Sequence, residues 1–186
     1  NGYAGWYLNK TKEGIARTFI EAVYGADDFP VASIDEWPTS KAFNIGWVAL
    51  RSGWEDDDIL LAFLSSSSDV AHNHWDRNSF ILNVNGEWLL SDPGYHSYNP
   101  GPETNVSTGT MGHNCILFDG EGQSLKSGGA IIGFLTSPTF DYVAGDATSA
   151  YVNVGIGKWQ RHILYLKPDY FLIFDDVDTG AIERDV

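Results

Sequence analysis

Two histidines one residue apart, His72 and His74, are the residues whose types and spacing most directly suggest chemistry. Side chains alternate faces along an extended segment, so both imidazoles would point to the same side of one. Asn85-Gly86 is a strong β-hairpin signal, and a hairpin there would fold Asp92 back beside the histidines. A further imidazole follows at His113. We therefore expect imidazole and carboxylate groups to gather in one part of the fold.

The composition of this cluster is that of a metal site. Zinc typically takes three protein ligands from His, Asp and Glu, together with water or a fourth group. His74, Asp92 and His113 supply such a set. Spacing alone does not separate metal binding from histidines that are satisfied by hydrogen bonds in a polar cleft, so both interpretations stay open at this point.

Several neighbouring residues have both a functional and a structural interpretation. Tyr95 and Tyr98 could approach a substrate as proton donors or stacking surfaces, or they could be loop aromatics packed on the fold. Asp76 could be an acid of the site or a turn residue. Arg77 could pair with an anionic sugar, although arginine on a β-sandwich usually forms surface salt bridges. His162 lies in a later strand, where we expect a packing or exposed position.

Length and composition predict one well-cored domain, with or without a remnant of another. The chain has 186 residues, of which 43% are hydrophobic, and its many aromatic residues fit a β-rich core. No apolar run is long enough to span a membrane. Cys115 is the only cysteine, which excludes an internal disulfide. The formal net charge of −14 argues against a nucleic acid partner, because phosphate binding needs a basic surface.

The elements that must position the cluster fall into two regions. From Lys12 to Tyr24 apolar residues recur at helical spacing, which predicts one amphipathic helix followed by a linker. From Phe43 onward short apolar runs alternate with turns, and this pattern predicts an all-β fold, an antiparallel β-sandwich. The expected strands are 46–51, 59–63, 80–84, 87–90, 115–118, 130–135, 140–143, 151–154, 162–166 and 170–174. A lone helix cannot bury its apolar face, so it must pack on the following domain or on helices outside this chain. The chain begins without a methionine and stops shortly after an apolar strand, and we expect it to be a piece of a longer protein.

Three segments together resemble the heparinase II/III family of polysaccharide lyases, which includes alginate and oligoalginate lyases. They are FNIGWVALRSGW, HNHWDRNSFILNVNGEWLLSDPGY and GHNCILFDGEGQ. In that family a H-x-H-x-D segment, a hairpin, a D-P-G-Y element and a later H-N segment recur in this order. The resemblance covers roughly residues 43 to 175, and the ordered set is far more specific than any one segment.

The resemblance implies a two-domain enzyme with its active site between a helical toroid and a β-sandwich. Residues 1–38 would be a helix and linker from the end of the toroid, and residues 39–186 the sandwich. His74, Asp92 and His113 match the positions that hold a zinc ion in metal-binding members, where we expect a structural role. His72 matches the substrate-facing catalytic histidine. We expect Tyr95 and Tyr98 to be catalytic as well. We expect the neighbouring Asn73 and Asn114 to bind substrate.

The implied reaction is β-elimination on a 4-linked uronic-acid polysaccharide. The acidic net charge opposes an anionic substrate unless the rest of the protein carries a basic face. Recognition of sulfate needs basic residues, and the chain has only 11 Lys plus Arg, which favours an unsulfated uronate such as alginate as the substrate. The substrate class implies a secreted or periplasmic protein, and this chain alone is expected to be inactive. The alternatives are a non-catalytic carbohydrate-binding or structural sandwich with a structural ion, and a zinc hydrolase.

Overall fold

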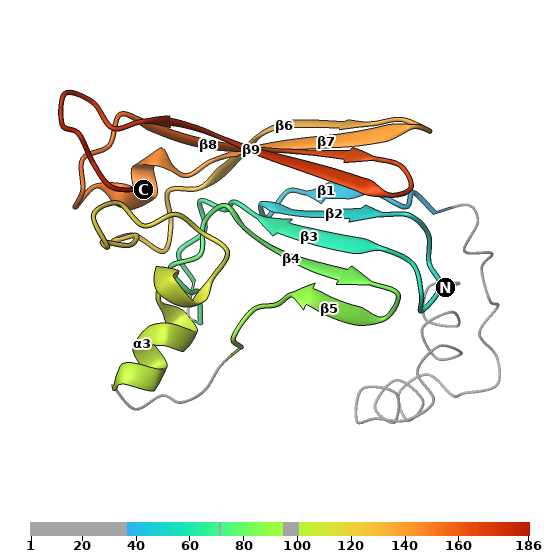
Figure 1. Cartoon of the computed structure of the whole chain (residues 1–186), viewed down its shortest axis with the longest axis horizontal. Coiled ribbons are helices and arrows are strands. Elements are labelled where there is room, and N and C mark those ends of the chain that lie inside the picture. Colours follow the sequence, from blue (N-terminus) through green and yellow to red (C-terminus); the bar gives the residue numbers. More distant parts are fainter. Residues whose placement is uncertain (1–36, 71, 95–100) are drawn as a thin grey trace. The chain divides into compact units, whose positions relative to one another are not determined.

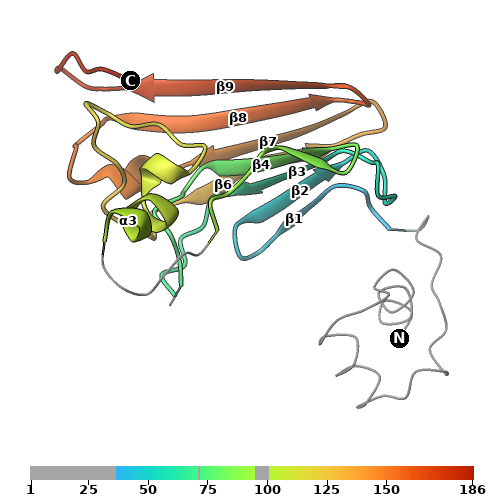
Figure 2. The ribbon, with the colours of Figure 1, turned by 60° about the horizontal axis from the view of Figure 1, so that its bottom comes forward.

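The computed structural model describes residues 37–70, 72–94 and 101–186. The predicted helix from Lys12 to Tyr24 lies outside these residues, and the assignment of residues 1–38 to a helical toroid stays a prediction. Thr39–Val186 forms one compact unit. Its strands pair antiparallel in two sheets (Figures 1 and 2), so the predicted β-sandwich is confirmed.

The first sheet has five strands in sequence order, and the long connection between its third and fourth strands carries His72 and His74. Its strands are β1 (Lys41–Phe43), β2 (Trp47–Arg51), β3 (Leu60–Leu64), β4 (Ser79–Val84) and β5 (Glu87–Leu90). Asn85 and Gly86, both at positive φ, form the turn between β4 and β5 as the Asn-Gly signal predicts. This turn brings the end of β5 back towards the start of β4, and therefore brings Asp92 back towards the histidines.

The second sheet has four strands, also in sequence order. They are β6 (Ala130–Thr136), β7 (Phe140–Asp146), β8 (Lys158–Leu166) and β9 (Tyr170–Asp178). The side chains of β8 alternate between buried and partly exposed, because one face of the sheet packs inward.

The core lies between the two sheets. Val48, Leu61 and Phe63 of the first sheet pack with Val143 and Ile163 of the second in one buried cluster. A second cluster, around Phe118, Tyr151 and Trp159, lies beneath the connections at one end. Burial of these apolar faces on both sides is what holds the two layers together.

Two predicted strands were wrong. Residues 115–118 make only one isolated bridge, between Phe118 and Glu121. Residues 151–154 continue the 3-10 helix η3 (Thr148–Tyr151) into a turn. Both segments are apolar because they fill the second cluster, where Tyr151 donates a hydrogen bond to the Ile116 carbonyl. Burial therefore explains their composition without a sheet ladder.

Besides η3, two helical segments among the described residues were not predicted, and both lie beside the site. They are α3 (Pro102–Thr108), visible in Figure 1, and the 3-10 helix η2 (Thr110–Gly112). The short strand β1 was also missed. No helix among the described residues is long and apolar enough to cross a membrane.

Candidate functional site

The histidine segment lies between β3 and β4 and is not an extended strand. His72 has a φ of 72°, in the left-handed region that a residue with a Cβ rarely adopts. The prediction placed His72 and His74 on the same side of an extended strand, and this was wrong because the segment is not extended. Both side chains nevertheless line the same cavity.

Three separate segments meet at one group of ligating side chains. The Nδ1 atom of His74 lies 3.2 Å from the Nε2 atom of His113. The same Nε2 atom lies 3.2 Å from the Oδ2 atom of Asp92. Together with Asp76, these residues place potential ligand atoms within 4.8 Å of one another. The three residues expected from the sequence thus come together, and Asp76 joins them.

Short backbone and side-chain bonds fix the two histidine segments against each other. The Trp75 amide donates to the Thr108 carbonyl at 2.9 Å, and the Thr110 hydroxyl donates to the Trp75 carbonyl at 2.9 Å. His113 directly follows η2, and its amide donates to Thr110. The position of His74 relative to His113 is therefore set by bonds within Thr108–Thr110 as well as by the sheet.

The hydrogen bonds of His113 leave its Nε2 atom free to carry a proton or to bind a metal ion. Its Nδ1 atom lies 2.8 Å from the Gly109 carbonyl, which can only accept, so Nδ1 carries a proton. The Nε2 atom then faces the Asp92 carboxylate and the His74 ring. A proton or a metal cation at Nε2 relieves the repulsion between its lone pair and the Asp92 carboxylate. The donor set and its geometry therefore fit a metal ion.

Shifts in pKa follow from the same contacts. Burial lowers the pKa of His113, but the hydrogen bonds to Asp92 and Gly109, together with the negative charges of Asp92 and Asp76, raise it by more. The hydrogen bond from His113 lowers the pKa of Asp92. Burial lowers the pKa of His74, which favours its neutral, ligating form.

Asp76 and Arg77 had an open interpretation in the sequence, and the structure makes both part of the site. Arg77 is only 1% exposed, so the expected surface salt bridge was wrong. Its Nη2 atom donates to Asp76 at 2.6 Å and to the His74 carbonyl at 3.2 Å. Among the described residues its Nε atom has no hydrogen-bond partner. Arg77 thus fixes both a potential ligand and the backbone of another.

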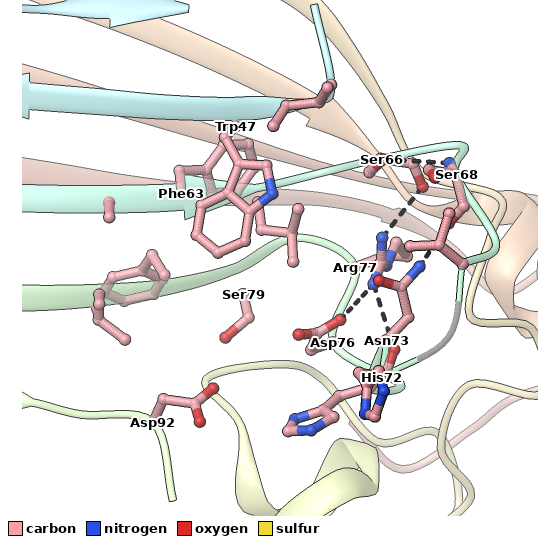
Figure 3. Close-up of a pocket in the computed structure, with 17 residues that line it drawn as sticks. Trp47, Phe63, Ser66, Ser68, His72, Asn73, Asp76, Arg77, Ser79 and Asp92 are labelled. Carbon is pink, nitrogen blue, oxygen red and sulfur yellow. Dashed lines mark hydrogen bonds and ion pairs between the residues drawn. The ribbon is translucent and has the colours of Figure 1, made fainter. Parts of the chain in front are cut away.

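An open cavity of about 530 Å³ lies against this group. His72, Asn73, Asp76 and Asp92 line one part of it, and Trp47 lines another (Figure 3). His72 is exposed, whereas the side chain of His113 is fully buried. His72 is therefore accessible from the cavity, while His113 lies behind its wall.

The other predicted site residues are placed differently. The Asn73 side chain donates to the Ser68 carbonyl at 2.7 Å on the cavity wall. The Asn114 side chain donates to the Phe80 carbonyl at 2.8 Å, a contact that anchors its segment to β4. Their substrate-binding roles stay predictions. Tyr95 and Tyr98 lie outside the described residues.

Residues 35–184 of the chain match the sequence model of the protein family described as heparinase II/III-like, C-terminal. The chain belongs to this family. Among curated protein sequences there was no significant match.

Solved structures with a similar fold include lyases of this kind. The heparan sulfate lyase HepC from Pedobacter heparinus has a TM-score of 0.70 and 21% identity, with 92% of this chain and 27% of that chain covered. A heparinase III described as the BT4657 gene product has a TM-score of 0.74 and 20% identity, covering 94% and 27%. Another heparinase III has a TM-score of 0.68 and 18% identity, covering 82% and 24%. These likenesses show the fold, and the chain spans about a quarter of each protein's length.

Proposed function

We propose that this chain supplies the β-sandwich half of the active site of a polysaccharide lyase, which cleaves 4-linked uronic-acid chains by β-elimination. The observation that supports it most directly is the cavity lined by His72 beside the group His74, Asp92 and His113. A helical toroid in the same protein would supply the other half. A secreted or periplasmic location belongs to the same proposal, because the substrate is extracellular.

The reaction sets the demands on the site. A base removes the proton from the carbon next to the uronate carboxylate, the bond to the 4-linked sugar breaks, and an acid protonates the leaving oxygen. The ionised carboxylate makes that proton very weakly acidic. The site must therefore place a positive or hydrogen-bonding group at the carboxylate, where it stabilises the enolate-like intermediate.

His72 is the described side chain best placed for this work. It is exposed on the cavity wall, so its imidazole can neutralise the carboxylate or accept the proton. Asn73, on the same wall, can donate to the substrate. Tyr95 and Tyr98 are proposed as further catalytic residues, as proton donors.

We propose zinc as the ion held by His74, Asp92 and His113, with Asp76 as a fourth candidate ligand. Ligands about 2.0–2.1 Å from a tetrahedral zinc ion lie about 3.3 Å apart. The two closest pairs of ligand atoms here are each 3.2 Å apart. Zinc would supply a fixed positive charge that ties three chain segments together behind His72. The residues themselves hold those segments through Arg77 and Gly109.

The test uses the protein that contains this chain together with its helical domain. Wild-type protein should raise the ultraviolet absorbance of uronic-acid polysaccharide as unsaturated products form. His72→Ala should lower the rate by about 10²–10⁴-fold, the usual contribution of one acid-base group. His162→Ala is the matched control, because His162 bonds to Tyr142 on the second sheet and does not line the cavity.

The outcomes separate the alternatives. Unchanged activity in His72→Ala contradicts the role given to that residue. Polysaccharide binding by wild-type protein without any turnover would favour a non-catalytic carbohydrate-binding module instead.

A further inference from the structure

Trp47 is a large aromatic side chain in the candidate cavity that the catalytic proposal does not use. It is the first residue of β2 and is 46% exposed. Its neighbour Val48 is buried between the sheets, so Trp47 points to the outer face of the first sheet. Figure 3 shows its indole above the cavity, with Asp92 and His72 on the lower side.

The sheet leaves open space beside this indole. Two residues further along β2, on the same face, is Ala49, which lies opposite Ala62 of β3. Ala62 and the partly buried Ile81 of β4 form the next pair. Trp47 itself lies opposite Leu64 of β3, and both side chains line the cavity, so the indole and the sheet face beside it form one apolar wall against which a flat molecule can lie. The cavity volume of about 530 Å³ is within the range of small-ligand sites.

Polar groups line the same cavity. The side chains of Ser66, Ser68 and Asn73 contribute hydroxyl and amide groups. A pyranose ring has an apolar face of C–H groups and a rim of hydroxyls. An indole face in the same cavity as hydroxyl and amide groups complements both parts of such a ring.

We infer that Trp47 is a stacking platform for one pyranose ring of the bound polysaccharide, beside the ring that His72 contacts. The inference rests on the proposed function, because it takes the ligand to be the polysaccharide. Trp47 would determine affinity and positioning without taking part in proton transfer. Its effect would therefore appear in substrate binding and KM more than in kcat.

The first experiment titrates the protein that contains this chain together with its helical domain, in its His72→Ala form, with an alginate-derived hexasaccharide. Affinity is measured by calorimetry, and the indole N–H signals are followed by NMR. Trp47→Ala should weaken binding by about 3- to 10-fold, the fold-change expected for one aromatic contact. Trp47→Phe should retain most of the affinity. The indole signal that is absent in Trp47→Phe should shift on titration.

Trp88→Ala is the matched control. Trp88 is 54% exposed on β5 of the same sheet but does not line the cavity. Its removal should leave the affinity unchanged. Equal weakening by both alanine variants, or no effect of Trp47→Ala, would overturn the inference. An unresponsive Trp47 indole would also overturn it, as expected if a protein segment covers this face.

The second experiment separates this inference from the lyase proposal. In the protein with its helical domain, Trp47→Ala should raise KM by a similar factor and leave kcat within about twofold. Turnover with an unchanged KM in Trp47→Ala would overturn the stacking platform and leave the lyase intact. Trp47-dependent binding without turnover in wild-type protein would overturn the lyase and support the platform.

Discussion

The chemistry of the candidate metal centre depends on which atom of His113 carries a proton. With Nδ1 committed to the Gly109 carbonyl, a metal can bind only at Nε2, and only after Nε2 has lost its proton. The hydrogen bonds to Asp92 and Gly109 raise the pKa of this histidine despite its burial. Below that raised pKa the metal-free site therefore contains an ion pair of His113 and Asp92.

Metal binding should consequently release a proton from His113. At a pH below the raised pKa of His113, zinc binding is expected to release about one proton from this residue, and the release should vanish well above that pKa. Calorimetric titration of metal-free protein in buffers of different ionisation enthalpy measures this number. His74→Ala should lower the zinc content of the purified protein. Zinc content equal to that of wild type in His74→Ala would show that His74 is not a ligand.

As pH rises through the folded pKa of His113, the affinity for metal should rise, whereas the stability of the metal-free protein should fall. A histidine whose folded pKa is raised stabilises the fold below its unfolded pKa, and this contribution is lost as pH rises through the folded pKa. Asp92, whose pKa is lowered, contributes above its unfolded pKa and loses the contribution as pH falls through the folded value. Without metal, the pair of His113 and Asp92 therefore stabilises the protein mainly at pH values between the folded pKa of Asp92 and the folded pKa of His113.

The types of the residues predicted the candidate metal ligands, but not the residues that surround and position them. His74, Asp92 and His113 followed from residue type and from the family resemblance, and the structure brings them together. The buried position of Arg77 could not be predicted, because its sequence context does not distinguish a surface strand from a loop folded inward. The place of Trp47 at the cavity depends on which face of β2 is covered, which only the packing of the two sheets decides.

At the scale of elements, η2 sets the direction of His113. Gly109 directly precedes η2, and Gly112 is its last residue. A Cβ on Gly112 would lie 2.0 Å from the Val106 carbonyl oxygen, and one on Gly109 would lie 2.2 Å from the Asn105 carbonyl oxygen. Both are backbone atoms of α3, so a side chain at either glycine requires the two helices to separate.

Gly112→Ala should therefore disturb the metal centre from outside its ligand set. We expect a loss of about 2 kcal/mol in unfolding free energy, typical of a steric clash with backbone, together with weaker zinc binding. Chemical denaturation and zinc titration measure the two effects. Gly120→Ala is the comparison, because a Cβ at Gly120 would have no neighbouring atom within 4 Å, and it measures the effect of losing a glycine in an open turn. Wild-type zinc affinity in Gly112→Ala would contradict the role given to η2.

Strands were predictable from the sequence where an apolar segment both pairs with a neighbouring strand and buries one face in the core. Residues 87–90 and the turn before them were predicted as observed, because Asn-Gly fixes the hairpin. The pattern failed at residues 115–118 and 151–154, where apolar side chains pack into the second core without strand partners. The short helix α3 was missed because its seven residues contain mostly polar residues and no apolar helical stripe.

At the scale of the whole molecule, Arg161 joins the second sheet to the site. Its Nε and Nη2 atoms bind both carboxylate oxygens of Asp175 at 2.9 and 2.8 Å. Its Nη1 atom donates to the Asn78 carbonyl at 2.9 Å and also to the Asn114 carbonyl. Asn78 leads into β4, and Asn114 directly follows His113. These partners are far apart in sequence, so no local pattern predicts the connection.

Arg161→Met should therefore affect both stability and metal binding. Asp175 would keep a partly buried charge without its partner, for which we expect a loss of about 3 kcal/mol in unfolding free energy. The two carbonyls would lose their shared donor, so the segment after His113 should loosen and zinc affinity should fall about tenfold. Lys158→Met is the control, because its ion pair with Asp176 is solvent-exposed and should contribute less than about 1 kcal/mol. If Arg161→Met loses stability while its zinc affinity matches that of wild type, the second sheet supports the fold but does not position the metal ligands.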